Sequence, residues 1–100
     1  MFNFLKRLFS RKVADYHSFN VCFYVGDLPH DESDLLSDQF LDFVENLAFE
    51  ANGATSYTAV SLCLSSDYKI KDTDITKIKE WLSIHNRQEF DITEPKTYYI

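Results

Sequence analysis

Apolar side chains at every second position of residues 18–25 constrain the fold of this chain more than any other feature. In the segment SFNVCFYV, the apolar set Phe19, Val21, Phe23 and Val25 alternates with Asn20, Cys22 and Tyr24. Because successive side chains of a strand point to opposite faces of a sheet, the pattern predicts a strand with one well-buried face. This strand is the first element of the predicted fold.

A helix is predicted directly after this strand. Gly26 and Pro29 end the strand, and Asp31 or Ser33 is placed to cap the helix that follows. Its apolar residues recur every three or four positions up to about residue 47: Leu36, Phe40, Phe43, Val44 and Leu47. This spacing predicts an amphipathic helix with one face toward the core.

A second helix is predicted near the C-terminal end of the chain. Asp72 or Thr73 can cap it, and it should end near Asn86. Its core face comprises Ile75, Ile78, Leu82 and His85, with Trp81 beside them. We expect Trp81 to share one hydrophobic core with Phe23, Phe40, Phe43 and Val60.

The remaining strands lie between and after the helices. Residues 47–53 (LAFEANG) and 56–65 (SYTAVSLCLS) predict a hairpin that turns at Asn52-Gly53. Phe90 and Ile92 predict a last strand, which Pro95 breaks before an aromatic end at Tyr98 and Tyr99.

The predicted order is strand, helix, strand, strand, helix, strand. It favours an α+β fold of the ferredoxin-like, split β-α-β (βαββαβ) type, a four-stranded antiparallel sheet with both helices on one face. We expect a basic amphipathic N-terminal segment at residues 1–17 and a single α+β domain at residues 18–100. A chain of one hundred residues can bury enough apolar surface to fold as one domain. The first and third strands are neighbours in such a sheet, so Cys22 and Cys63 could lie near each other without a chemical role, and a disulfide between them is the minority alternative. We expect both thiols to be reduced in a cytoplasmic monomer.

No pattern of catalytic, metal-binding or cofactor-binding residues emerges. The three histidines are isolated in the sequence, and Asp38, Asp42 and Glu45 have the spacing of a solvated helix face. Gly26 and Gly53 are the only glycines, so a phosphate-binding loop is excluded. The third strand offers only Tyr57 for base stacking, which disfavours sequence-specific RNA readout. We therefore expect a protein that is not an enzyme, has no cofactor and binds no DNA.

The first twelve residues, MFNFLKRLFSRK, form a basic tip on an acidic protein. They contain Lys6, Arg7, Arg11 and Lys12 and no carboxylate, although the whole chain has a formal charge of −6. Residues 13–100 therefore carry −10. Three interpretations are open: a contact with ribosomal RNA phosphates, an amphipathic helix on a membrane surface, or a helix packed on the domain or a frayed terminus. The short segment and the acidic domain disfavour the membrane.

Residues 19–100 resemble the YggL family of bacterial proteins that bind the large ribosomal subunit. The resemblance is carried by FNVCFYV, LSDQFLDFVENLAFEANG (36–53), DTDITKIKEWL (72–82) and EPKTYYI (94–100). It implies a non-enzymatic cytoplasmic protein that binds the 50S subunit, its RNA and its proteins, in assembly or translation. Lys6, Arg7, Arg11 and Lys12 would then contact rRNA phosphates, although the segment is shorter and more apolar than the family's basic N-terminus.

Two other functions are compatible with the sequence. One is a small acidic regulatory or immunity-type adaptor that binds a basic site on a partner protein. The other is a ferredoxin-like domain that binds a small molecule, for which an apolar pocket would be needed. Co-sedimentation with ribosomal subunits distinguishes a protein of the large ribosomal subunit, which should associate with large subunits, from an adaptor, which should associate only with free protein.

Overall fold

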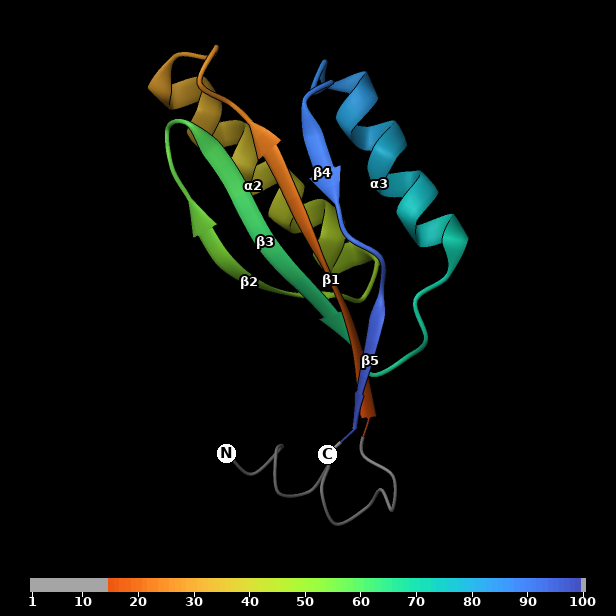
Figure 1. Ribbon diagram of the computed structural model, residues 1–100. Coiled ribbons are helices and arrows are strands. Elements are labelled where there is room, and N and C mark those ends of the chain that lie inside the picture. Colours follow the sequence, from red (N-terminus) through yellow and green to blue (C-terminus); the bar gives the residue numbers. More distant parts are fainter. Residues whose placement is uncertain (1–14, 100) are drawn as a thin grey trace.

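The computed structural model describes residues 15–99, which form two helices and a five-stranded antiparallel sheet (Figure 1). The elements in chain order are β1 (Asp15–Tyr24), α2 (His30–Asn46), β2 (Glu50–Thr55), β3 (Ala59–Ser66), α3 (Asp72–Ile84), β4 (Phe90–Ile92) and β5 (Lys96–Tyr99). The α+β class is confirmed. None of the helices in this part of the chain has the length and apolar composition needed to span a membrane.

β1 is the central strand and pairs with three others. The sheet order is β2-β3-β1-β4, and β5 pairs with β1 as well. β4 pairs with β1 from Val21 to Phe23, and β5 pairs with it from Asp15 to Ser18. The prediction of four strands is therefore corrected to five. β1 begins at Asp15, three residues before the predicted start, and this extra length supplies the partner for β5.

The interruption between β4 and β5 lies around Pro95, as its missing N–H requires. The backbone N–H of Thr93 donates to the carbonyl oxygen of Asn20 at 3.0 Å, and the Thr93 hydroxyl accepts from the Asn20 N–H at 2.8 Å. Thr93 thus continues the edge of the sheet across the gap. The strand order is consistent with a split β-α-β arrangement.

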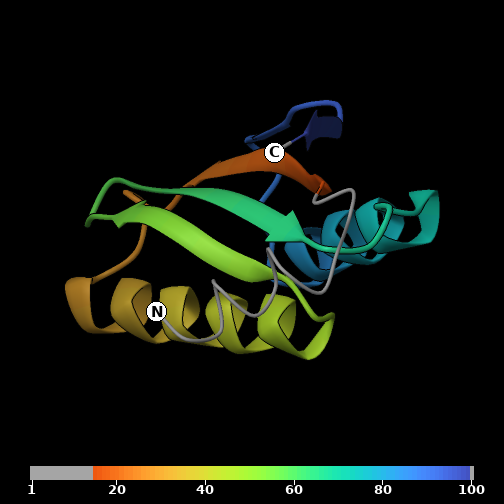
Figure 2. The same cartoon turned by 90° about the horizontal axis from the view of Figure 1, so that it is seen from below.

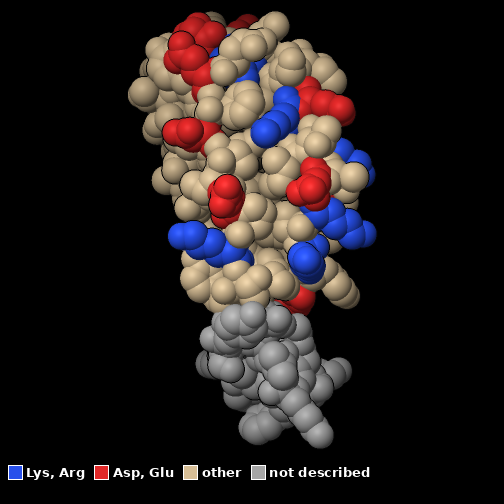
Figure 3. Space-filling model, turned by 45° about the vertical axis from the view of Figure 1, so that its right-hand side comes forward, with Lys and Arg blue, Asp and Glu red and all other residues tan. Residues whose placement is uncertain are grey.

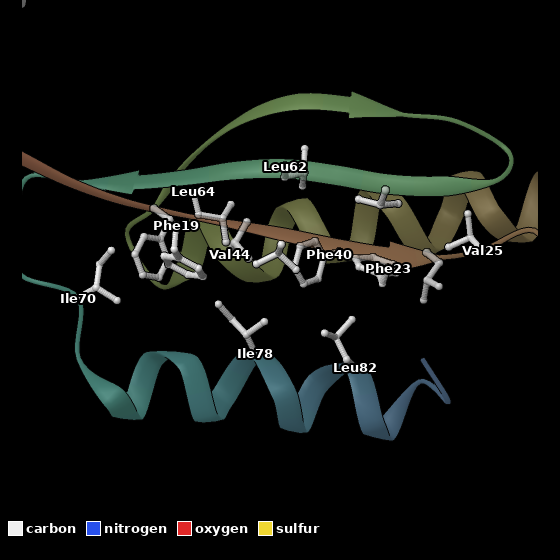
Figure 4. Close-up of a cluster of buried hydrophobic side chains, with 14 residues drawn as sticks. Phe19, Phe23, Val25, Phe40, Val44, Leu62, Leu64, Ile70, Ile78 and Leu82 are labelled. Atoms are coloured by element: carbon white, nitrogen blue, oxygen red, sulfur yellow. The ribbon is translucent and has the colours of Figure 1, made fainter. Parts of the chain in front are cut away.

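The core lies between one face of the sheet and the two helices. Cross-strand pairs Phe19–Leu64, Val21–Leu62 and Phe23–Val60 place their side chains on this face, and all six are buried. Phe40 and Val44 of α2 and Ile78 and Leu82 of α3 complete the same cluster (Figure 4). Figure 2 shows α2 stacked along one side of the sheet.

The predicted core set is confirmed in part. Phe23, Phe40 and Val60 are buried, and the Phe23 and Phe40 rings meet edge to face at 5.0 Å. Phe43 and Trp81 are only partly buried and pack against the margin of the cluster, with their rings stacked at 5.7 Å.

Both helix starts differ from the predicted caps. The N-cap of α2 is Pro29, where Asp31 or Ser33 was predicted. The N-cap of α3 is Lys71, where Asp72 or Thr73 was predicted. Each helix thus begins before the polar residues expected to cap it. Ser33 faces the core and is 1% exposed. At the start of α3 the carboxylate of Asp74 accepts the Lys71 backbone N–H at 3.1 Å.

Both helices end in a Schellman motif, in which a residue with positive φ reverses the chain. Ala48 (φ 69°) has this role after α2, and Phe49 N–H donates to the carbonyl oxygen of Val44 at 3.1 Å. Asn86 (φ 59°) has it after α3, which agrees with the predicted end near Asn86.

The predicted hairpin is present, but its turn lies elsewhere. β2 continues through Asn52-Gly53, and the turn is at residues 56–58. The Ser56 hydroxyl accepts the backbone N–H groups of Thr58 (3.2 Å) and Ala59 (3.1 Å) there. Gly53, with φ 150°, is needed because a Cβ at this position would collide with the Ser61 carbonyl of β3.

Candidate functional site

The open face of the sheet carries small, polar and aromatic side chains. Because side chains alternate along β1, its even-numbered residues point away from the core: Tyr16, Ser18, Asn20, Cys22 and Tyr24. The register aligns them in rows across the strands. One row contains Glu50, Ser65, Ser18 and Lys96, and the next contains Asn52, Cys63 and Asn20.

A groove of about 630 Å³ lies over these rows. Its lining comes from β1, β2, β3, β5 and the segments after α2 and β3: Tyr16, Ser18, Ala48, Glu50, Asn52, Cys63, Ser65, Ser66, Asp67, Tyr68 and Tyr98. We call this cavity the open-face groove. Its volume is in the range of pockets that bind small ligands or single side chains.

Tyrosines form the walls of the open-face groove. The rings of Tyr16 and Tyr98, on neighbouring strands, stack at a centroid distance of 5.2 Å and an angle of 21°. They remain 37% and 44% exposed, and Tyr68 is 76% exposed. The groove therefore presents aromatic surface to solvent.

Ser18 forms part of the floor and is only 8% exposed. Its hydroxyl makes no hydrogen bond to another residue of the described part of the chain. The Ser18 hydroxyl can still meet a ligand in the groove, whereas the fully buried hydroxyl without a partner in the described part of the chain is that of Ser33 in α2.

The charges of the groove have one sign. Glu50 and Asp67 belong to its lining, and among the described residues that line it there is no lysine or arginine. The nearest cation in the register is Lys96, opposite Ser18 on β5. Residues 13–68, which contain β1, α2, β2 and β3, hold ten carboxylates and no lysine or arginine.

The positive charges of the described chain lie in residues 69–100. These residues contain six lysines and arginines and six carboxylates: Lys69, Lys71, Lys77, Lys79, Arg87 and Lys96 among Asp72, Asp74, Glu80, Glu89, Asp91 and Glu94. On the face that carries α3, basic and acidic groups are interspersed (Figure 3).

A second polar cluster joins the loop after β1 to the loop after α3. The guanidinium of Arg87 donates to both carboxylate oxygens of Asp27, at 2.6 and 3.0 Å, and to the Tyr24 carbonyl oxygen at 3.2 Å. These hydrogen bonds hold the pKa of the Asp27 carboxyl below its usual range. Arg87 is 7% exposed, so the cluster serves to fix two loops.

The histidines lie far apart and each has a local partner. His17 is hydrogen bonded to the Thr97 hydroxyl at 2.8 Å, and His30 stacks on Tyr57 at 3.7 Å. His85 stacks on Trp81, and its Nδ1 lies 2.8 Å from the Trp81 carbonyl oxygen, so this nitrogen is the donor. Within residues 15–99 no three potential ligands gather around a metal position.

The predicted rRNA-contact residues Lys6, Arg7, Arg11 and Lys12 lie outside the described residues. The predicted segment 1–17 lies there as well, except that Asp15, Tyr16 and His17 belong to β1. Cys22 and Cys63 occupy neighbouring strands with a two-residue offset, and both are free and half-buried.

Sequence reasoning missed the open-face groove. In the sequence Tyr98 is only part of an aromatic end, and Tyr16 lies within the predicted basic segment. The available signal was the alternation of β1, which places Tyr16, Ser18 and Asn20 on the face opposite the core.

Comparisons of this chain with known protein families, curated proteins and solved structures reveal no match.

Proposed function

We propose that this chain is a non-enzymatic cytoplasmic protein that binds the large ribosomal subunit. The observation that carries the proposal is the separation of charge. Four cations lie in residues 1–12, and ten carboxylates without a lysine or arginine lie in residues 13–68. A basic tip suits rRNA phosphates, and an acidic surface suits the basic ribosomal proteins and avoids nonspecific RNA.

The resemblance of residues 19–100 to the YggL family supports the same function. We further infer a ferredoxin-like fold, which the order of elements and the strand order β2-β3-β1-β4 support. β5 is then an addition at the free end of β1. A fold of this kind serves many functions, so the proposal depends on the charges and the quoted motifs.

Co-sedimentation tests the proposal. The full chain is mixed with purified large and small subunits at low salt and centrifuged through a sucrose cushion. We expect it to pellet with large subunits in a saturable, stoichiometric manner and to stay in the supernatant with small subunits. Equal recovery with both subunits, or with neither, would refute a specific large-subunit protein.

A second function, the acidic adaptor for a basic site on a free partner protein, is favoured by the open-face groove. Its described lining residues include Glu50 and no lysine or arginine, and its walls are tyrosines. In the co-sedimentation experiment an adaptor of this kind stays in the supernatant. Cross-linking in cell extract would then recover it with a free protein instead.

A further inference from the structure

We propose that the open-face groove binds a lysine or arginine side chain of a basic protein segment. This inference extends the proposed function by naming the part of the ribosome that the acidic surface contacts, a basic segment of a ribosomal protein. It stands on the groove, the tyrosine walls, the Ser18 hydroxyl and the distribution of charge.

The walls and the charge select a cationic ligand. The faces of tyrosine rings attract ammonium and guanidinium groups, and Tyr16, Tyr68 and Tyr98 are all accessible. Glu50, on β2, supplies a carboxylate across β3 from Tyr16 of β1 and Tyr98 of β5. A cation therefore finds aromatic surface on one side and an anion on the other.

The floor supplies hydrogen-bond acceptors for such a group. The Ser18 hydroxyl lines the groove beside Ser65, its partner on β3, and Asn52 of β2 lies in the next row, opposite Cys63. Ammonium and guanidinium groups carry three and five N–H donors, so oxygen atoms at the floor can satisfy those that the carboxylate leaves free.

The same lining disfavours phosphates and nucleotides. An anionic ligand would meet Glu50, and none of the lining residues within 15–99 is a lysine or arginine that would offset the repulsion. The surrounding elements reinforce this preference, because residues 13–68 contain ten carboxylates and no lysine or arginine, and Lys96 of β5 is the nearest lysine in the register. A base stacked on Tyr16 and Tyr98 would bring its phosphate into this negative field.

NMR titration of the isotopically labelled full chain tests the groove. The probe is a capped lysine–glycine repeat peptide, with its arginine and glutamate counterparts and with polyuridine RNA as comparisons. We expect the lysine and arginine peptides to shift the amide signals of Ser18, Asn52 and Cys63 in a saturable manner. We expect the glutamate peptide and the RNA to leave these signals in place.

Variants distinguish the groove from general attraction to an acidic protein. Glu50→Gln should weaken the peptide about three- to tenfold, and Tyr98→Ala should weaken it about two- to fivefold. Asp91→Asn is the matched control, because Asp91 is an exposed carboxylate of β4 on the same sheet face but outside the groove. It should change the affinity less than twofold at physiological salt.

Three results would overturn the inference: no shift of groove amides, equal effects of Glu50→Gln and Asp91→Asn, or binding of polyuridine in the groove in place of the peptide. Co-sedimentation separates this failure from that of the proposed function. If Glu50→Gln loses the peptide and still pellets with large subunits as the parent does, the groove is not the ribosomal contact. If the parent binds peptide and does not pellet, the ribosomal function is wrong and the groove stands.

Discussion

Ala48 is a single residue whose backbone is held in an unfavourable conformation. Its φ of 69° lies in the left-handed region, which glycine adopts freely and L-residues with a Cβ do not. Both hydrogen bonds of the Schellman motif depend on it, because Ala48 N–H donates to the Glu45 carbonyl oxygen at 2.9 Å and Phe49 follows. The helix end therefore retains a local strain.

We expect Ala48→Gly to stabilise the fold by about 0.5–1 kcal/mol, because glycine relieves the strain. Urea denaturation of both proteins measures this change. Ala51→Gly in β2 is the control and should destabilise by a similar amount, since Ala51 has an ordinary strand conformation. Destabilisation by both variants would show that Ala48 is unstrained.

Asp27 makes stability depend on acid pH. The Arg87 hydrogen bonds lower the pKa of Asp27 in the folded state. The ion pair therefore stabilises the fold fully when the pH is above the unfolded pKa of about 4. This stabilisation is lost as the pH falls through the lower pKa of the folded state. Asp27→Asn should therefore be less stable than the parent at neutral pH, with the difference shrinking below about pH 4.

Denaturant melts across a pH series measure the Asp27 effect. Asp38→Asn, which removes an exposed carboxylate of α2, is the control and should not reproduce the profile. A difference between Asp27→Asn and the parent that stays constant from neutral to acid pH would exclude the ion pair as its origin.

Among the elements, the β2–β3 hairpin shows why a sequence signal can be placed wrongly. Asn-Gly is the commonest tight-turn pair, because glycine accepts positive φ. Here Gly53 uses its positive φ within β2, where the missing Cβ allows close approach to Ser61. An Asn-Gly pair can therefore form a turn or lie within a strand. The pairing of Gly53 with Leu62 shows that it lies within a strand here.

Gly53→Ala should destabilise the fold by about 1–3 kcal/mol or more, because a side chain is strained at this φ and also collides with β3. Chemical denaturation measures the loss. Ala54→Ser, at the next position of β2 and exposed, should change stability little. If Gly53→Ala leaves the free energy of unfolding unchanged, Gly53 does not lie within β2 against β3, and the turn is at Asn52-Gly53.

Two phenylalanines of α2 contribute unequally to the core, and the difference can be measured. Phe40 is fully buried against Phe23, whereas Phe43 is half-buried between Phe40 and Trp81. Phe40→Ala should cost about 3–5 kcal/mol and Phe43→Ala about 2–3 kcal/mol, as judged by denaturant melts. A loss below about 1 kcal/mol for Phe43→Ala would mean that the register of α2 is wrong.

For the molecule as a whole, periodicity predicted the elements better than their assembly. The alternation of Phe19, Val21 and Phe23 and the stripe of Phe40 and Val44 depend on local spacing, which the sequence contains. The fifth strand depends on how far β1 extends beyond β3 and β4. The open-face groove draws residues from six separate segments, so no single stretch of sequence reveals it.

The separation of charge between the basic tip and the acidic domain leads to a prediction about salt. If Lys6, Arg7, Arg11 and Lys12 all meet rRNA phosphates, the logarithm of the affinity for large subunits should fall with the logarithm of salt concentration at a slope of about −3. This slope corresponds to a weakening on the order of a hundredfold between about 50 and 200 mM salt. Deleting residues 1–12 should remove most of the slope.

The fold should persist in the deletion variant, because every described helix and strand begins at Asp15 or later. Circular dichroism of the full and shortened chains checks this before subunit binding is measured across the salt series. The Glu50→Gln variant completes the comparison. Because the groove is expected to bind protein and not RNA, this change should lower the affinity for large subunits. It should leave most of the salt dependence in place, since that dependence comes from the phosphate contacts. Identical slopes for the full and shortened chains would exclude the basic tip from the ribosomal contact and leave the acidic domain as its source.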